Sequence, residues 1–131
     1  MLRINNNEYK VLTSDLKYVD ASYNSKKGYS ILVSLDIQLN EIKGYISFYV
    51  DFFDDNDIKI IENRKYIELP TQLNSKISMI EIYDTNNFID FIDSEVNLEF
   101  GNIDNDRIEM KLNIDDELIK LEYKGLLNIK Y

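Results

Sequence analysis

Hydrophobic and polar residues alternate along two neighbouring stretches of this chain, and that alternation constrains the fold more than any other feature. In residues 29–39, YSILVSLDIQL, every second residue is apolar, and the residues between them are polar except Leu32. Residues 44–53, GYISFYVDFF, repeat the pattern. A period of two is typical of a β-strand with one buried face. We therefore predict two strands, joined as a hairpin by residues 40–43.

The register of this hairpin follows from the apolar positions. A slip by one residue would turn one strand's apolar side chains towards solvent and break every apolar pair. The predicted pairs are Ile37 with Ile46, Leu35 with Phe48, Val33 with Val50, and Ile31 with Phe52.

The C-terminal part, RIEMKLNIDDELIKLEY and onwards, predicts a second hairpin. A two-residue turn at Asp115-Asp116 would suit a tight hairpin, because aspartate tolerates a positive φ. The predicted pairs are Leu112 with Ile119, Met110 with Leu121, and Ile108 with Tyr123. Alternation then continues to Tyr131 with Gly125 on the inward face, which predicts a bend where the strand turns a corner.

The remaining segments predict shorter elements. Strands are expected at residues 17–23, 58–61, 65–69, 76–83 and 95–100. A short helix is expected at 84–93, where apolar residues have helical spacing and Asp84 can cap the N-terminus. A helix at 14–23 is the alternative to the first of these strands. We predict one all-β, mainly antiparallel domain over residues 1–131, a β-sandwich or flattened barrel with one short helix near 84–93.

Composition excludes several kinds of chemistry. The chain has no cysteine and no histidine, so the usual thiolate nucleophile, neutral-pH base and zinc ligands are missing. No P-loop and no G-x-S-x-G motif occurs. We therefore expect no enzyme activity and no cofactor. With a net charge of −9, we expect no nucleic-acid binding. Without a long apolar run or a signal peptide, we expect a cytoplasmic protein with no membrane contact.

The acidic stretch DFFDDNDIKIIE, residues 51–62, could hold calcium or could simply be a turn. Against the EF-hand pattern, Phe53 replaces an oxygen ligand and Asn56 replaces the glycine of the sharp turn. A looser calcium site remains as a hypothesis, alongside the interpretation as an ordinary solvated turn. Its candidate ligands are Asp54, Asp55, Asp57, Asp104 and Asp106.

Aromatic residues on strand 44–53 give a more specific hypothesis. Tyr45, Tyr49 and Phe53 lie on the face opposite the core, and rows of exposed aromatics are typical of interaction surfaces. The alternative is that the 84–93 helix or another layer covers this face. If it is open, nearby carboxylates would attract a basic protein partner. Those carboxylates are Asp51, Asp54, Asp55 and Asp57.

The leading functional hypothesis is therefore a non-catalytic bacterial or phage protein that binds a basic protein. Its most specific form is an acidic immunity protein or inhibitor that blocks a basic toxin or nuclease. One alternative is a β-barrel or sandwich that binds a sugar or small ligand in a tyrosine-lined cavity. Another is a structural or assembly subunit, with residues 117–131 as an edge strand that pairs with a second chain.

Overall fold

A computed structural model gives the structure of residues 1–20, 29–39, 42–52, 58–68, 77–83, 88–90, 94–117 and 119–130. These residues form ten strands and one 3-10 helix. The strands are β1 (Leu2–Ile4), β2 (Asn7–Asp20), β3 (Tyr29–Leu39), β4 (Ile42–Phe52), β5 (Lys65–Glu68), β6 (Ile77–Tyr83), β7 (Phe88–Asp90), β8 (Val96–Asp104), β9 (Arg107–Asp115) and β10 (Lys120–Lys130), and the 3-10 helix η1 is Ile58–Ile61.

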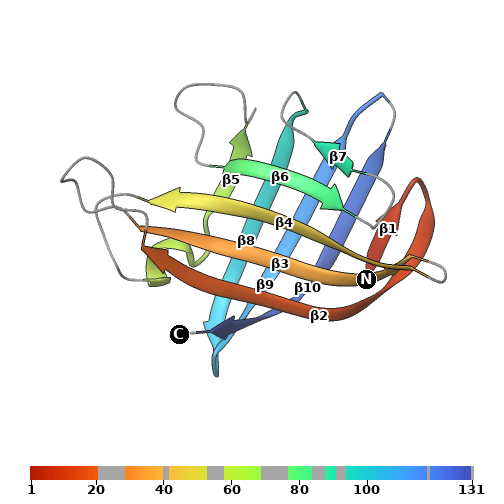
Figure 1. The fold of residues 1–131 in the computed structure, drawn as a ribbon. Helices are drawn as coiled ribbons and strands as arrows, with labels where there is room; N and C mark the ends of the chain where they lie inside the picture. Colours follow the sequence, from red (N-terminus) through yellow and green to blue (C-terminus); the bar gives the residue numbers. More distant parts are fainter. Residues whose placement is uncertain are drawn as a thin grey trace.

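All ten strands belong to one sheet, in the order β5-β8-β9-β10-β1-β2-β3-β4-β6-β7. The sheet curls over itself, so that β2, β3, β4 and β6 lie across β8, β9 and β10 (Figure 1). The inward faces of the two halves form the core, whose largest fully buried side chains include Phe48 and Phe100. The predicted all-β, mainly antiparallel architecture is confirmed, with one parallel pairing between β10 and β2.

The predicted helix at 84–93 is wrong where the structure describes it. Residues 88–90 form β7, which pairs with β6 from Glu81↔Asp90 to Tyr83↔Phe88. The rest of that range, 84–87 and 91–93, lies outside the described residues. Apolar spacing over so few residues fits a strand as well as a helix, and the open side of β6 offers backbone partners. Within the described ranges, no helix is long and apolar enough to cross a membrane.

Other short elements divide between confirmed and wrong predictions. Residues 14–20 belong to β2 and are not helical, while β5, β6 and β8 overlap the predicted strands. Residues 58–61 were predicted as a strand but form η1. Ile58 and Ile61 are both buried there. Their separation of three residues is one turn of a 3-10 helix, which places both on one side.

Both predicted hairpin registers are wrong by an even number of residues, and both predicted faces are right. Leu35 pairs with Ile46, where Phe48 was predicted. Leu112 pairs with Tyr123, where Ile119 was predicted. Because side chains alternate with a period of two, an even slip keeps every apolar residue on the same face. Alternation therefore determines the face, and turn geometry decides among the even registers.

The turns that the structure describes are of two kinds. Asn5-Asn6 and Asn105-Asp106 all have positive φ, from 48° to 66°, as a two-residue type I′ turn requires. They connect β1 to β2 and β8 to β9. Asp115-Asp116 has no positive φ. The connection there runs from Asp116 to residue 119, with the Asp116 N–H donating to the Ile119 carbonyl at 2.9 Å. The Ser94 hydroxyl also donates to the Asp116 carboxylate, which ties this turn to the start of β8.

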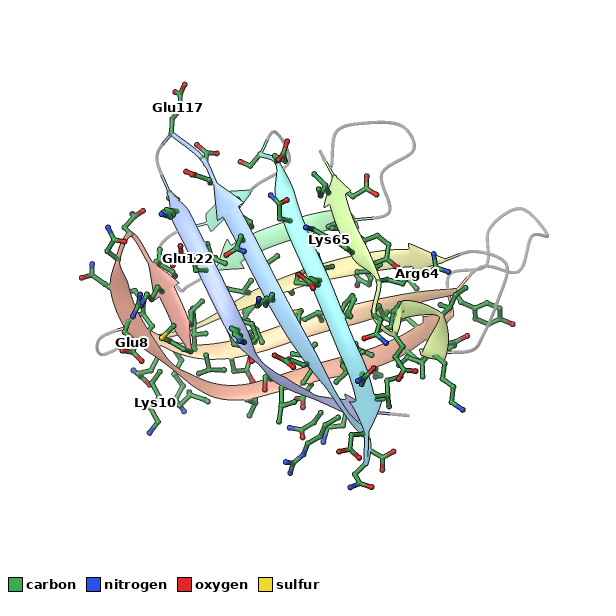
Figure 2. All side chains as sticks on the ribbon, turned by 180° about the vertical axis from the view of Figure 1, so that it is seen from behind. Glu8, Lys10, Arg64, Lys65, Glu117 and Glu122 are labelled. Atoms are coloured by element: carbon green, nitrogen blue, oxygen red, sulfur yellow. The ribbon has the colours of Figure 1, made fainter. Side chains whose placement is uncertain are left out.

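Strand β10 changes partners on either side of Gly125, in agreement with the predicted corner. Before it, residues 121–123 pair antiparallel with β1, and after it, residues 128–130 pair parallel with β2. The strand pairs with β9 from Lys120 to Asn128 and curves strongly towards its end (Figure 2). At the corner, the Ser14 hydroxyl of β2 donates to the Leu126 carbonyl at 2.8 Å. The transfer from β1 to β2 lets the sheet curl without interrupting β10.

Two tyrosines, the half-buried Tyr66 and the buried Tyr123, predict a loss of stability at high pH. Burial raises the pKa of Tyr66 and of Tyr123, and a hydrogen bond with Ser14 partly offsets this rise for Tyr123. In the unfolded chain both phenols ionise near their usual pKa of about 10. The unfolded state therefore loses protons first, so stability is retained below about pH 10 and falls as pH rises towards the folded pKa values. Urea unfolding at pH 9 to 11 should show a smaller fall for Tyr66→Phe than for the unchanged chain. An equal fall would contradict the assignment.

Candidate protein-binding surface

The outer surface of β3 and β4 carries both of the predicted tyrosines, Tyr45 and Tyr49. In the observed register Tyr49 lies opposite Leu32, Ser47 opposite Ser34, and Tyr45 opposite Asp36. Directly opposed residues of an antiparallel pair have their side chains on the same face. We call this set the tyrosine face, and it comprises Leu32, Ser34, Asp36, Tyr45, Ser47 and Tyr49. Both tyrosines are half-buried, and Asp36 is exposed.

Of the six residues of this face, the sequence analysis named only Tyr45 and Tyr49 as binding residues, and Asp36 is the charged residue that it missed. The Thr13 hydroxyl on β2 donates to its carboxylate at 2.7 Å, which holds the charge beside Tyr45. With the predicted register, Asp36 would have been placed two residues away from Tyr45. The Leu-Asp alternation in 29–39 did show that Asp36 points outward. Only the true register shows which aromatic residue it accompanies.

The outer surface of β9 and β10 has a different composition. Its outward residues are mostly charged and include Arg107, Glu109, Lys111, Asp115, Lys120, Glu122, Lys124 and Lys130. Charges of both signs alternate there, and the Lys120 Nζ and Glu122 Oε1 atoms lie 3.6 Å apart at exposed positions. This is the composition of an ordinary solvated surface, in which ion pairs contribute little. Hydroxyls and aromatics dominate the tyrosine face instead.

Of the other predicted binding residues, the structure describes only the position of Asp51. Asp51 lies on β4 opposite Ser30, a buried serine at the end of the same outer surface. Phe53, Asp54, Asp55 and Asp57 lie outside the described residues, and their role stays a prediction. Residues 88–90 of the predicted covering helix do not cross the tyrosine face, because they extend the sheet beyond β6.

The predicted calcium ligands Asp104 and Asp106 lie at the β8–β9 hairpin. Asp106 belongs to the positive-φ turn, so a turn accounts for its presence there. Asp104 and the cationic Arg107 both line a depression of about 390 Å³. Its other lining residues are Asn102, Asn105 and Leu126. Among the residues that the structure describes, no group of three acidic side chains is placed to hold a metal ion.

The two alternative functions meet different outcomes. The ligand-binding alternative predicts an interior cavity lined by tyrosine and phenylalanine, whereas the depression described above lies beside the β8–β9 turn and has no aromatic residue in its lining. The assembly alternative named residues 117–131 as an edge strand, and this placement is wrong. Strand β10 is flanked by β9 on one side and by β1 and β2 on the other. The ends of the sheet are β5 and β7.

Comparison with known proteins found no matching family model, no similar curated protein and no similar solved structure.

Proposed function

We propose that this protein is a non-catalytic binding module that engages a basic protein partner through the tyrosine face. In its most specific form, the partner is a basic toxin or nuclease and the protein is its immunity protein or inhibitor. A partner bound across β3 and β4 would contact Tyr45 and Tyr49 directly. Blocking by coverage requires no reactive group on the inhibitor, which suits a chain without histidine or cysteine.

The contrast between the two outer surfaces carries this proposal. The centres of protein interfaces are depleted in charged residues and enriched in tyrosine, while ordinary surface is rich in lysine and glutamate. The tyrosine face has the first composition, and the outer surface of β9 and β10 has the second. Tyrosine has few rotatable bonds, and small neighbours such as Ser34 and Ser47 leave its ring accessible, so it can be buried against a partner at little entropic cost.

Electrostatics favour a basic partner. The chain has a net charge of −9, so a cationic protein is attracted over its whole surface. Asp36 supplies a negative charge within the face, beside Tyr45. The predicted acidic residues of the 51–57 segment would add to the attraction at the end of β4. Exposed charges of this kind chiefly accelerate association, while the buried anchors slow dissociation.

The test is capture of the partner by the tagged protein in its native host, followed by measured affinities for variants of the face. Tyr49→Ala is expected to weaken binding by about 2 kcal/mol, roughly thirtyfold, because interface tyrosines are typical hot spots. Asp36→Lys is expected to reduce the association rate most at low salt. Asp55→Lys tests the predicted acidic segment in the same way. A captured toxin or nuclease should lose its activity when the unchanged protein is added.

Glu109→Lys is the matched control for Asp36→Lys. It makes the same change of charge at an exposed position on β9, outside the tyrosine face. Equal affinities for Tyr49→Ala, Asp36→Lys and the unchanged protein would contradict the assignment of the face. Equal losses for Asp36→Lys and Glu109→Lys would show that net charge alone directs the binding.

For the fold, we infer a flattened, incompletely closed barrel as the finer description of the curled sheet. The support is the continuity of a single sheet through β10, β1 and β2, which a sandwich of two separate sheets would lack.

A further inference from the structure

Strand β5 forms one end of the sheet and has an open side. It pairs with β8 from Lys65↔Glu99 to Glu68↔Val96. Among the described residues, no strand pairs with its other side. Edge strands present unpaired N–H and C=O groups, which are templates for another strand.

The register shows which backbone groups of β5 face the open side. The Phe100 N–H donates to the Arg64 carbonyl at 2.9 Å, so these two residues form a hydrogen-bonded pair of the antiparallel ladder. Hydrogen-bonded pairs alternate along such a ladder. Tyr66 and Glu68 therefore direct their backbone groups towards β8. Lys65 and Ile67 direct theirs towards the open side.

The side chains of β5 divide between two faces in the same way. Ile67 is 58% exposed on the outer face, where Lys65 is also exposed. Tyr66 faces inward, with its ring edge-on to Phe100 at 6.4 Å between centroids. Arg64 and Glu68 are each two residues from Tyr66 and so lie on the same face of the strand. Their charges act on the pKa of Tyr66, which Arg64 lowers and Glu68 raises. Figure 2 shows Arg64 and Lys65 at the start of the strand.

We propose that β5 pairs antiparallel with β5 of a second copy of this chain, in a register centred on Tyr66. Lys65 then lies opposite Ile67 of the second copy, and Ile67 lies opposite Lys65. The free backbone groups of both residues are thereby used in hydrogen bonds. Arg64 lies opposite Glu68 of the second copy, and the reverse pair repeats this contact.

The sequence of the strand is what identifies the occupant as a second copy. RKYIE is self-complementary about its central tyrosine, because a basic residue faces an acidic one at both ends. The lysine stem covers the exposed isoleucine of the other chain. If the twofold axis of the dimer is perpendicular to the sheet, the inner faces of the two copies lie on the same side of the joined sheet. Inward-facing residues of one copy must then lie opposite inward-facing residues of the other. The register centred on Ile67 also meets this condition, but it leaves Arg64 without an opposed carboxylate.

A ladder of this length makes a small interface, so the dimer is expected to be weak and rapidly reversible. We expect self-association at concentrations of roughly 0.1–1 mM in sedimentation equilibrium of the full chain. The contact lies on β5, away from the tyrosine face, so its presence or absence is independent of the proposed function.

Cysteine cross-linking tests the register, because the chain contains no cysteine of its own. The Lys65→Cys and Ile67→Cys chains are mixed in a glutathione redox buffer, and the products are separated by mass. Opposed residues of a hydrogen-bonded pair have Cα atoms about 5.5 Å apart, which suits a disulfide. Identical positions would be roughly 9 Å apart, which is too far. We therefore expect the mixed disulfide in at least about fivefold excess over either homodimer.

Charge reversal provides the second test. Arg64→Glu and Glu68→Arg are each expected to weaken self-association by about tenfold, and combining them in one chain should restore it. Glu109→Lys and Glu109→Cys, on β9, are the controls for charge and for random cross-linking. The proposal is overturned if the Lys65→Cys and Ile67→Cys chains cross-link no faster than Glu109→Cys chains do. It is also overturned if the Ile67→Cys homodimer forms in excess over the mixed disulfide. A partner strand from a different protein would leave both assays at their baseline and would also overturn it.

Discussion

Replacing Phe48 with alanine is expected to lower the free energy of unfolding by about 3–5 kcal/mol. Phe48 is fully buried between the two halves of the sheet, opposite Val33 on β3. Removing its ring deletes apolar contacts on both sides and leaves a cavity that surrounding strands cannot close. In thermal unfolding, the melting temperature should fall by roughly 10–20 °C.

Tyr49→Ala is the matched control, because it truncates the next aromatic residue of the same strand on the opposite face. Tyr49 is half-buried on the outer surface, so its removal is expected to cost less than about 1.5 kcal/mol. A similar cost for both variants would contradict the assignment of faces on β4. The small cost also matters for function, because the variant stays folded and its partner affinity can be interpreted.

Gly125→Ala is expected to destabilise the protein by about 1–3 kcal/mol, although it adds only a methyl group. A Cβ atom there would lie 2.5 Å from the Tyr123 hydroxyl oxygen and 2.9 Å from Cζ of the same ring. Tyr123 is only 5% exposed, so the ring has little room to move aside. Gly125 does not have a positive φ, so a steric clash is the expected cause. Chemical denaturation with linear extrapolation measures the change.

A double-mutant cycle separates this clash from other causes. In a Tyr123→Leu background the ring is gone, and Gly125→Ala should then be nearly neutral or slightly stabilising. Alanine is intrinsically preferred over glycine within a strand. If Gly125→Ala costs the same in both backgrounds, the ring is not the reason for the glycine, and the bend of β10 would have to be explained through its backbone.

Turn chemistry shows where sequence signals were available and where they were not. Asn5-Asn6 stands between short alternating segments, and asparagine accepts the positive φ that both residues adopt, so the β1–β2 hairpin could have been predicted. Asp115-Asp116 carries a similar signal but forms a different turn. Its Asp116 carboxylate accepts a hydrogen bond from Ser94, a residue far away in the sequence. That interaction exists only once β8 and β9 are already adjacent.

The candidate surface could be predicted only in part, because the sequence indicates the face of a residue but not its neighbours on the paired strand. Alternation by itself placed Tyr45 and Tyr49 on the outer face of their strand, and the structure agrees. Their neighbours across the hairpin depended on the register, which decides that Asp36 and Leu32 complete the face. The contrast with the outer surface of β9 and β10 required knowing that both surfaces belong to one curled sheet.

The sequence by itself determined the long strands of the two predicted hairpins, which face of each of them is buried, and that the chain has no histidine and no cysteine. A period of two is a local property, and a one-residue slip would expose the core, so these features follow from the order of residues alone. The tertiary structure decided the even registers, the 3-10 turn at 58–61, and the strand at 88–90. It also decided that β10 is interior and β5 is an edge. Such features depend on backbone hydrogen bonds and packing between residues distant in the sequence, and those partners exist only in the folded sheet.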